Sequence, residues 1–157
     1  MGLYLDIETD YQRRITVLGV YGRGLGLVQL VGSEITRRRF MRLLPDKGQL
    51  FTFFGHRFDL PIIRDQVGIC LRTRFESCDL YDICRRAGLS GGQKAIEREL
   101  GITRSMPGMD GRDALRLWAE YKDGDPQALK TLLRYNRDDI MCMVRIHAAM
   151  RRARILP

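Results

Sequence analysis

The chain begins with apolar runs separated by short polar or glycine-rich segments, and this pattern predicts a sheet. The apolar runs cover residues 2–9, 15–21 and 25–31. Runs of this length between turn residues are typical of buried strands. The segment 22–24 reads Gly-Arg-Gly and indicates a tight hairpin. We therefore expect three strands that follow one another as an antiparallel meander.

Helical patterns and two further strands come next. Ser33 precedes a helical pattern and is the predicted N-cap of a helix over residues 34–44. The very apolar segment 50–54 follows this helix, so we expect a strand there that runs parallel to the first strand. A helix is predicted over residues 58–67, and a weaker strand pattern covers residues 75–80.

The remainder of the chain is predicted to be mostly helical. A helix continues from the weak strand through Arg86, and two others are expected over residues 93–100 and 112–122. Asp125 and Pro126 form a strong helix start, with aspartate at the N-cap and proline at the first helical position. The last helix then extends to about residue 152. Its apolar positions follow helical spacing: Leu129, Leu132, Leu133, Ile140, Met143, Val144 and Ile146.

Composition and charge narrow the class of protein. The chain has 157 residues and 45% hydrophobic content, which predicts a single domain over residues 1–157. Lys and Arg number 27 against 19 Asp and Glu, a net charge of +8, which favours nucleic acid over a membrane as the partner. Without a membrane-spanning run or a signal-peptide pattern, we expect a cytoplasmic protein. The four cysteines form no C-x-x-C pair, so a structural zinc site is not expected.

Two acids interrupt the first predicted strand near its end. Asp6 and Glu8 are two residues apart, a spacing that places both side chains on the same side of a strand. Two neighbouring buried carboxylates require a compensating cation, and Mg²⁺ selects carboxylate oxygens. The alternative is a strand end with two solvated acids, because the tripeptide by itself is a weak signal.

Asp59 is the third candidate ligand, and it follows closely on the predicted strand 50–54. If this strand neighbours the first one, Asp59 emerges beside Asp6 and Glu8. The alternative is that Asp59 favours the start of a helix through capping and the helix dipole.

The last helix carries the fourth candidate. Tyr135 and Asp139 are four residues apart and share one helix face, at the margin of the apolar stripe. Asp138 is turned away from that face. The alternative is an exposed tyrosine and aspartate on a solvated helix.

These motifs together resemble the tyrosine (DEDDy) branch of the DEDD superfamily of 3′→5′ exonucleases. Segments 5–9 and 133–139, with 91–97 and 124–125 between them, resemble a small group of predicted ribonuclease H-like exonuclease domains of bacteria and archaea. Many of these relatives have asparagine at the position of Phe54. The motif residues are Asp6-x-Glu8, Phe58-Asp59 and Tyr135-x-x-x-Asp139. The resemblance implies an α/β ribonuclease H-like fold, with a mixed central β-sheet of three antiparallel and then parallel strands, flanked by α-helices.

The resemblance also implies two Mg²⁺ or Mn²⁺ ions held by Asp6, Glu8, Asp59 and Asp139. In two-metal phosphodiester cleavage, one ion activates the attacking water and the other stabilises the leaving oxygen. Asp6 would bridge both ions, and Glu8 would hold the ion that carries the attacking water. Tyr135 would position that water, because a phenol with a pKa of roughly 10 is a poor base at neutral pH.

Contacts with the substrate are a further set of expectations. Backbone amides at Ile7 and Glu8 would grip a 3′ end, and Phe58 would stack on a base. Positively charged side chains that could contact phosphates are Lys94, Arg112 and Arg137, with ordinary surface charge as the alternative. Asp79 and Asp82 are interpreted as caps or supporting groups rather than ligands.

The sequence therefore yields one leading hypothesis and two alternatives. The first is a metal-dependent 3′→5′ exonuclease that hydrolyses phosphodiester bonds of DNA or RNA, with a single-stranded 3′ end as its substrate. The second is a ribonuclease H-type, structure-specific endonuclease that uses the same metals. The third is a catalytically silent nucleic-acid-binding module. The oligomeric state is left open.

Overall fold

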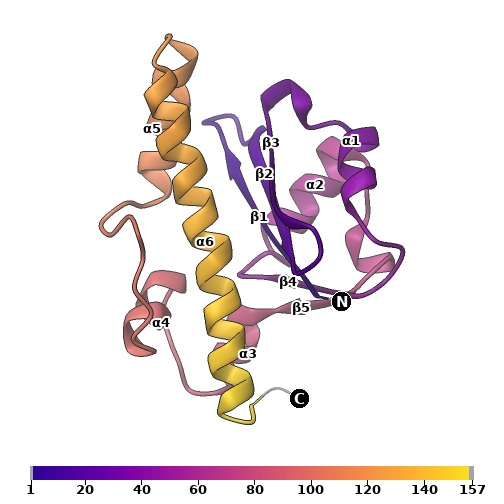
Figure 1. Cartoon of the computed structure of the whole chain (residues 1–157), viewed down its shortest axis with the longest axis vertical. Coiled ribbons are helices and arrows are strands. Elements are labelled where there is room, and N and C mark those ends of the chain that lie inside the picture. Colours follow the sequence, from indigo (N-terminus) through magenta and orange to yellow (C-terminus); the bar gives the residue numbers. More distant parts are fainter. Residues whose placement is uncertain (1, 156–157) are drawn as a thin grey trace.

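The computed structural model of the protein describes residues 2–155. It contains one five-stranded sheet with helices on both faces (Figure 1). The strands lie in the order β3-β2-β1-β4-β5. Strand β1 pairs antiparallel with β2 and β2 with β3, whereas β4 runs parallel to β1 and β5 parallel to β4. The expected α/β fold with a mixed sheet is confirmed. The strands are β1 (Gly2–Thr9), β2 (Ile15–Gly22), β3 (Gly26–Val31), β4 (Gln49–Thr52) and β5 (Glu76–Asp79).

Helices fill the connections after the meander. Helix α6 is the longest and lies along one face of the sheet, with α1 and α2 on the other (Figure 1). Two short 3-10 turns also occur: η1 (Gly32–Glu34) lies between β3 and α1, and η2 (Leu71–Thr73) lies between α2 and β5. The helices of residues 2–155 are α1 (Arg37–Leu43), α2 (Asp59–Val67), α3 (Leu80–Arg86), α4 (Gln93–Glu99), α5 (Gly111–Lys122) and α6 (Pro126–Arg152).

The predicted cap of the first helix is wrong. Ser33 lies inside η1, and α1 begins three residues later than expected, with Thr36 as its N-cap. The cause is a local turn that ends β3, in which the Glu34 carboxylate accepts a hydrogen bond from the Val31 amide. At the start of α6 the prediction is confirmed, because the Asp125 side chain accepts from the amide two residues later and proline occupies the first turn.

Strand β4 is shorter than predicted. It ends at Thr52, and the chain turns at Phe54, whose φ angle is +62°. The Phe54 amide donates to the side chain of Asp79 rather than to a neighbouring strand. The other predicted boundaries agree with the structure to within one residue.

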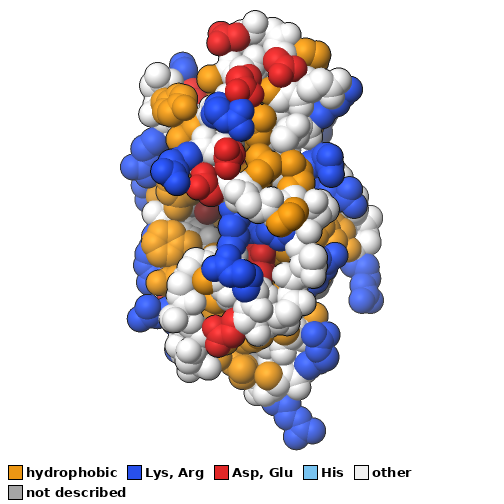
Figure 2. Space-filling view, turned by 90° about the vertical axis from the view of Figure 1, so that its left-hand side faces the viewer, with side chains coloured by type: hydrophobic (Ala, Val, Ile, Leu, Met, Phe, Trp, Pro, Cys, Tyr) orange, Lys and Arg blue, Asp and Glu red, His pale blue; other side chains and the backbone are white. Residues whose placement is uncertain are grey.

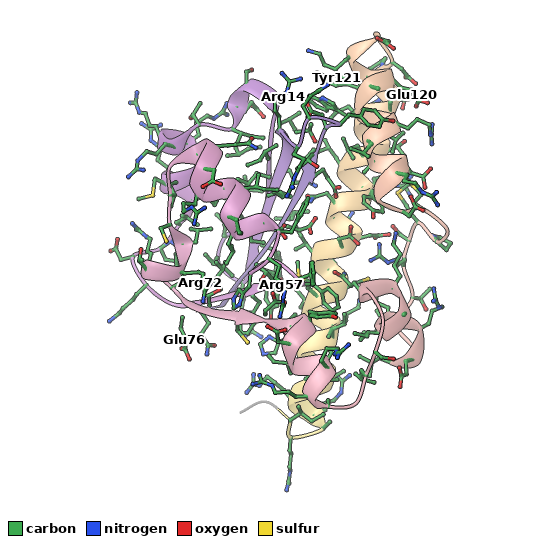
Figure 3. All side chains as sticks on the ribbon, turned by 180° about the vertical axis from the view of Figure 1, so that it is seen from behind. Arg14, Arg57, Arg72, Glu76, Glu120 and Tyr121 are labelled. Atoms are coloured by element: carbon green, nitrogen blue, oxygen red, sulfur yellow. The ribbon has the colours of Figure 1, made fainter. Side chains whose placement is uncertain are left out.

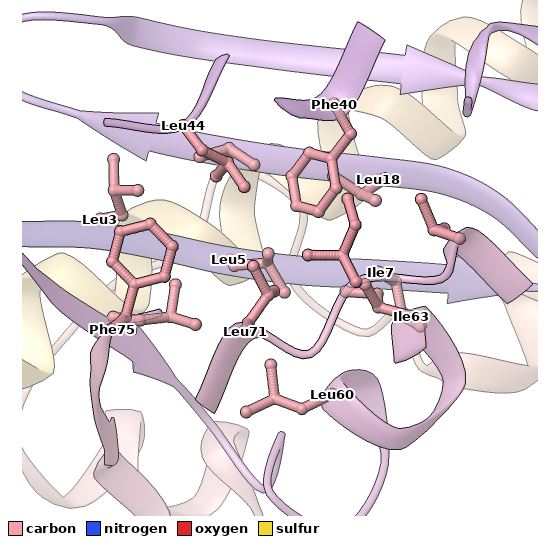
Figure 4. Close-up of a cluster of buried hydrophobic side chains, with 14 of the residues drawn as sticks. Leu3, Leu5, Ile7, Leu18, Phe40, Leu44, Leu60, Ile63, Leu71 and Phe75 are labelled. Atoms are coloured by element: carbon pink, nitrogen blue, oxygen red, sulfur yellow. The ribbon is translucent and has the colours of Figure 1, made fainter. Parts of the chain in front are cut away.

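Alternation along β1 decides which side chains face which helices. Leu3, Leu5 and Ile7 point into a core that also contains Phe40 of α1 and Ile63 of α2 (Figure 4). The even-numbered side chains point to the opposite face, where α6 packs. The two acids of β1 are even-numbered, so the alternation directs both of them towards α6.

Helix α6 approaches the sheet closely because β2 has a glycine at the crossing point. A Cβ atom at Gly19 would lie 2.3 Å from Asn136 Oδ1 and 2.5 Å from Ile140 Cδ1. Gly19 is also the β2 residue paired with Asp6 of β1. The missing side chain therefore lets α6 bring polar groups directly over Asp6.

Two other sequence features can be placed in the structure. Among residues 2–155, no helix is both long enough and apolar enough to cross a membrane. The four cysteines are present as free thiols, of which Cys84 and Cys142 are buried.

Candidate active site

Four carboxylates gather at the C-terminal end of β1. One carboxylate oxygen from each of Asp6, Glu8 and Asp139 lies within 4.8 Å of the others. Asp59 is adjacent and buried, and its Oδ1 accepts a hydrogen bond from the Ile7 amide at 3.0 Å. Segments far apart in the chain (β1, α2 and α6) thus bring together the four acids that the sequence singled out.

The turn between β4 and α2 delivers Asp59 to this place. Because β4 lies parallel to β1, the first residue of α2 emerges beside the end of β1. The turn is held by Asp79, whose carboxylate accepts from the amides of Phe54 at 2.7 Å and His56 at 3.0 Å. Asp79 also accepts from Tyr81 at the start of α3, which confirms its interpretation as a cap.

Asn136 fixes the orientation of Asp6, and it is not among the site residues expected from the sequence. This fully buried side chain donates from Nδ2 to Asp6 Oδ2 at 2.8 Å, and its Oδ1 accepts from Gln29 at 2.9 Å. The spacing of Asn136 could have marked it as a site residue, because it falls between Leu132 and Ile140 on the buried face of α6. A polar residue in such a stripe needs buried partners.

Arg104 is the second functional residue that sequence reasoning missed. It lies in the loop between α4 and α5 and donates to both Glu97 oxygens, at 2.5 and 2.7 Å. It also donates to Asp139 Oδ1 at 2.5 Å. The side chains of Arg104 and Glu97 are only 7% and 2% exposed, so this is a buried ionic network. No local pattern links Arg104 to Asp139 in the sequence.

The same loop is anchored by Asp138. Its carboxylate accepts from the Ser105 hydroxyl and from the Met106 amide, both at 2.8 Å. Asp138 is therefore directed away from the acid cluster, as predicted. It is buried against the loop rather than exposed to solvent.

Tyr135 and Lys94 line the cluster on its open side. Lys94 Nζ lies 3.2 Å from the Tyr135 hydroxyl and 4.9 Å from the centroid of its ring. It also contacts the carbonyl oxygen of Met109. A cavity of about 280 Å³ is bounded by both side chains together with Asp6, Phe53, Gly92, Gln93, Arg104 and Asp139.

Burial disfavours the ionised form of the four carboxylates. It raises the pKa of Asp6 and of Glu8 well above the ordinary range, and the neighbouring acids raise both further. It raises the pKa of Asp59 to about 7, despite the hydrogen bond from Ile7. Burial also raises the pKa of Asp139, although the Arg104 guanidinium opposes the shift. These groups need positive charge before all four can ionise at neutral pH.

The donor set fits divalent cations. Every candidate ligand atom is a carboxylate oxygen, the type that Mg²⁺ and Mn²⁺ prefer. Glu8 Oε1 is buried and accepts no hydrogen bond within residues 2–155. A buried acceptor without a partner is costly, and a bound cation removes that cost.

The residues predicted to contact the substrate differ in their exposure and in their partners. The Ile7 amide already donates to Asp59, so a substrate would have to displace that hydrogen bond to reach it. Phe58 is half-buried, with the Arg13 guanidinium 5.5 Å from its ring centroid. Arg137 is exposed on α6, and the exposed Arg112 contacts Asp110. Of the candidate basic side chains, Lys94 is the one that contacts Tyr135 beside the acid cluster.

A second group of possible ligand atoms has a structural explanation. His56, Asp79 and Asp82 also bring ligand atoms within 4.8 Å of one another. The Asp79 carboxylate accepts three backbone hydrogen bonds, and Asp82 forms an ion pair with Arg57 at 3.0 Å. These groups fix the β4–α2 turn and α3.

Comparison with known proteins gives a family match and a fold match. The family model for the RNase H superfamily matches residues 3–151. No curated protein matches the sequence. The solved structure of the family B DNA polymerase from the hyperthermophilic archaeon Pyrobaculum calidifontis is similar in fold, with a TM-score of 0.74 and 16% identity. The match covers 95% of this chain and 24% of the polymerase, so the chain spans about a quarter of that protein.

Proposed function

The chain belongs to the ribonuclease H superfamily, and within it we propose a metal-dependent 3′→5′ exonuclease that hydrolyses phosphodiester bonds of DNA or RNA. The observation that carries this proposal is the convergence of Asp6, Glu8, Asp59 and Asp139 beside the Tyr135 side chain. A nuclease-type fold with buried acids and a basic surface suits a hydrolase that acts on nucleic acid. The tyrosine and aspartate four residues apart on α6 favour the exonuclease over the endonuclease.

The four acids are proposed to hold two divalent ions, Mg²⁺ or Mn²⁺. When bound, such ions supply a hydroxide nucleophile and stabilise the leaving oxygen. Asn136 holds Asp6 Oδ2, which fixes the plane of that carboxylate. Arg104 likewise holds Asp139 Oδ1, so the free oxygens of both groups are presented in defined directions. Glu8 contributes the oxygen that has no protein partner among the described residues.

Tyr135 is proposed to orient the attacking water. Burial raises the pKa of its hydroxyl above the ordinary value of 10.0, and the charges of Asp139 and Glu8 raise it further. The phenol therefore remains protonated and can donate a hydrogen bond at any working pH. Lys94, 3.2 Å from that hydroxyl, restrains it and supplies positive charge next to the place where a phosphate would lie.

The positive charge of the surface supports a polyanionic substrate. Lys and Arg number 27 against 19 Asp and Glu. Figure 2 shows the side of the molecule formed by α4, α5 and α6, where Lys and Arg side chains are spread over the visible face. This charge attracts the phosphates of a nucleic-acid strand.

Tyr135→Phe and Asp139→Asn test the assignment on a linear and a circular single-stranded DNA of the same sequence. We expect Asp139→Asn to abolish cleavage. Tyr135→Phe should lower kcat by about 100-fold through loss of water positioning, with little change in KM. Tyr121→Phe removes a hydroxyl from a ring packed on Trp118, away from the acids, and serves as the matched control.

The circular substrate separates the three functional hypotheses. An exonuclease degrades the linear strand and leaves the circle intact. Linearisation of the circle would instead establish the endonuclease. Binding of both substrates without any cleavage in Mg²⁺ or Mn²⁺ would establish the silent binding module and refute the proposed hydrolysis.

A further inference from the structure

Phe54 combines backbone strain with exposure of a large aromatic ring. Its φ of +62° lies in the left-handed region, which bulky residues rarely adopt. Its side chain is 43% exposed, whereas the preceding Phe53 packs against the core cluster that contains Leu80 and Ile140. The hydrogen bond from its amide to Asp79, at 2.7 Å, holds this conformation. Core packing thus does not explain why the ring is presented to solvent.

Other aromatic and cationic side chains surround this ring. Tyr81 meets it edge-on, with centroids 5.1 Å apart and an interplanar angle of 87°. The Arg57 guanidinium lies 5.4 Å from the Phe54 centroid and 5.7 Å from the Tyr81 centroid. Arg85 lies 6.0 Å from the Tyr81 centroid. We refer to Phe54, Tyr81, Arg57 and Arg85 as the aromatic platform, and Figure 3 shows Arg57 close to the point where β5 leads into α3.

The aromatic platform is continuous with the candidate active site. Phe53 contacts Tyr81 edge-on, with centroids 5.8 Å apart. Phe53 also lines the cavity that contains Asp6, Tyr135 and Asp139. A strand whose end occupies that cavity would therefore reach the platform within a short distance of its terminus.

We propose that the aromatic platform stacks an unpaired base of a single-stranded nucleic acid bound at the candidate active site. This inference rests on the proposed function and specifies its substrate class. An exposed aromatic ring offers a stacking surface to any base, and the exposed Arg85 guanidinium attracts the phosphates. Bases inside a duplex are already stacked and paired, so the platform selects single-stranded ends over blunt duplexes.

Phe54→Asn and Phe54→Tyr test the proposal through binding. Asparagine accepts a positive φ more readily than phenylalanine, so the first variant removes the ring while keeping the turn. The probe is a fluorescein-labelled ten-nucleotide single strand with phosphorothioate linkages at its 3′ end, measured by anisotropy in Mg²⁺. A blunt duplex of the same sequence is the matched control ligand, and thermal melting of each variant monitors the fold.

Loss of one stacked base predicts that Phe54→Asn weakens single-strand binding by about 5- to 150-fold. Phe54→Tyr should bind within a factor of about two of the wild type, because it keeps the ring. Duplex binding should be the same in all three proteins. A change below twofold for Phe54→Asn, an equal loss on the duplex, or no binding of the single strand by the wild type would each overturn the platform.

The two proposals fail separately in this design. If the wild type cleaves a plain single strand but Phe54→Asn binds normally, the platform is refuted and the exonuclease stands. If single-strand binding depends on Phe54 but nothing is cleaved in Mg²⁺ or Mn²⁺, the platform stands and the exonuclease is refuted.

Discussion

Substitution of Asp59 by asparagine tests how the acid cluster is stabilised, because its effect should change sign with metal. Asp59 is buried, and its pKa is about 7 in the folded protein against an ordinary value of 3.8. Asparagine has almost the same shape, can still accept from the Ile7 amide and carries no charge. In EDTA at pH 8 we therefore expect the Asp59→Asn protein to be more stable than the wild type.

The sign follows from proton binding in the two states. Below pH 3.8 Asp59 is protonated whether the chain is folded or unfolded. Between pH 3.8 and about 7 the folded state alone keeps the proton, so the free energy of unfolding falls as pH rises through this window. Above a pH of about 7 this contribution to the free energy of unfolding is lost completely. The wild type should lose stability across this interval, and the variant should lose less.

The size of the effect follows from the same pKa difference. A difference of about 3 pKa units at about 1.4 kcal/mol per unit gives an upper value of about 4 kcal/mol. For a chain of 157 residues, this corresponds to a rise in Tm of about 8–16 °C in EDTA at pH 8. At pH 4 the two proteins should melt within about 2 °C of each other.

Divalent metal should reverse the order. One ligand at 100 times its Kd stabilises the folded state by about 2.7 kcal/mol, so two ions contribute about 5.4 kcal/mol. This exceeds the advantage of about 4 kcal/mol that the variant has in EDTA, and the variant lacks one carboxylate for binding the ions. Differential scanning calorimetry at pH 4 and 8, with EDTA or Mn²⁺, provides the measurement. Asp65→Asn on the same helix is the control, because Asp65 is exposed and forms an ion pair with its exposed neighbour Arg64. If the Asp59→Asn protein is no more stable than the wild type at pH 8 in EDTA, the buried Asp59 charge does not destabilise the metal-free protein.

Three further substitutions test the support of the site. Gly19→Ala should lower the free energy of unfolding by about 1–3 kcal/mol and reduce cleavage, because its Cβ would displace Asn136. Urea unfolding provides the measurement, and Gly111→Ala is the control, because a Cβ at Gly111 would point into open space. Arg104→Ala should cost about 3–5 kcal/mol in metal-free protein by leaving buried carboxylates unpaired, and a loss near that of an exposed ion pair, about 1 kcal/mol or less, would contradict the buried network. Adding Glu97→Gln to Arg104→Ala should restore part of that loss, and a double-mutant cycle without coupling would show that the two side chains act independently.

The sequence predicts the architecture well where the determining signals are local. The three-stranded meander follows from apolar runs and a hairpin signal, and the start of α6 follows from Asp125 and Pro126. Ser33 and Thr36 are both good capping residues, and local pattern could not choose between them. The choice depends on the turn closed by the Glu34 side chain, which forms only when β3 ends at Val31.

Some residues of the candidate site could be predicted from local sequence patterns, and others could not. The spacing of Asp6 and Glu8 on a strand fixes their common side, so their proximity could be predicted. Asn136 and Arg104 act through contacts between segments more than 30 residues apart in the chain, as the hydrogen bonds to Asp6 and Asp139 show. Such contacts depend on how closely α6 packs on the sheet, and no local pattern encodes that distance.

A time course on one single-stranded oligonucleotide, labelled at its 3′ end or at its 5′ end, tests whether the protein is a metal-dependent 3′→5′ exonuclease. It is made on DNA and on RNA, with Mg²⁺, Mn²⁺ or EDTA. A metal-dependent 3′→5′ exonuclease gives early release of the 3′ label and a ladder of shortening 5′-labelled strands, both in metal and neither in EDTA. Binding without cleavage in every metal condition, or release of the 5′ label first, would contradict this activity.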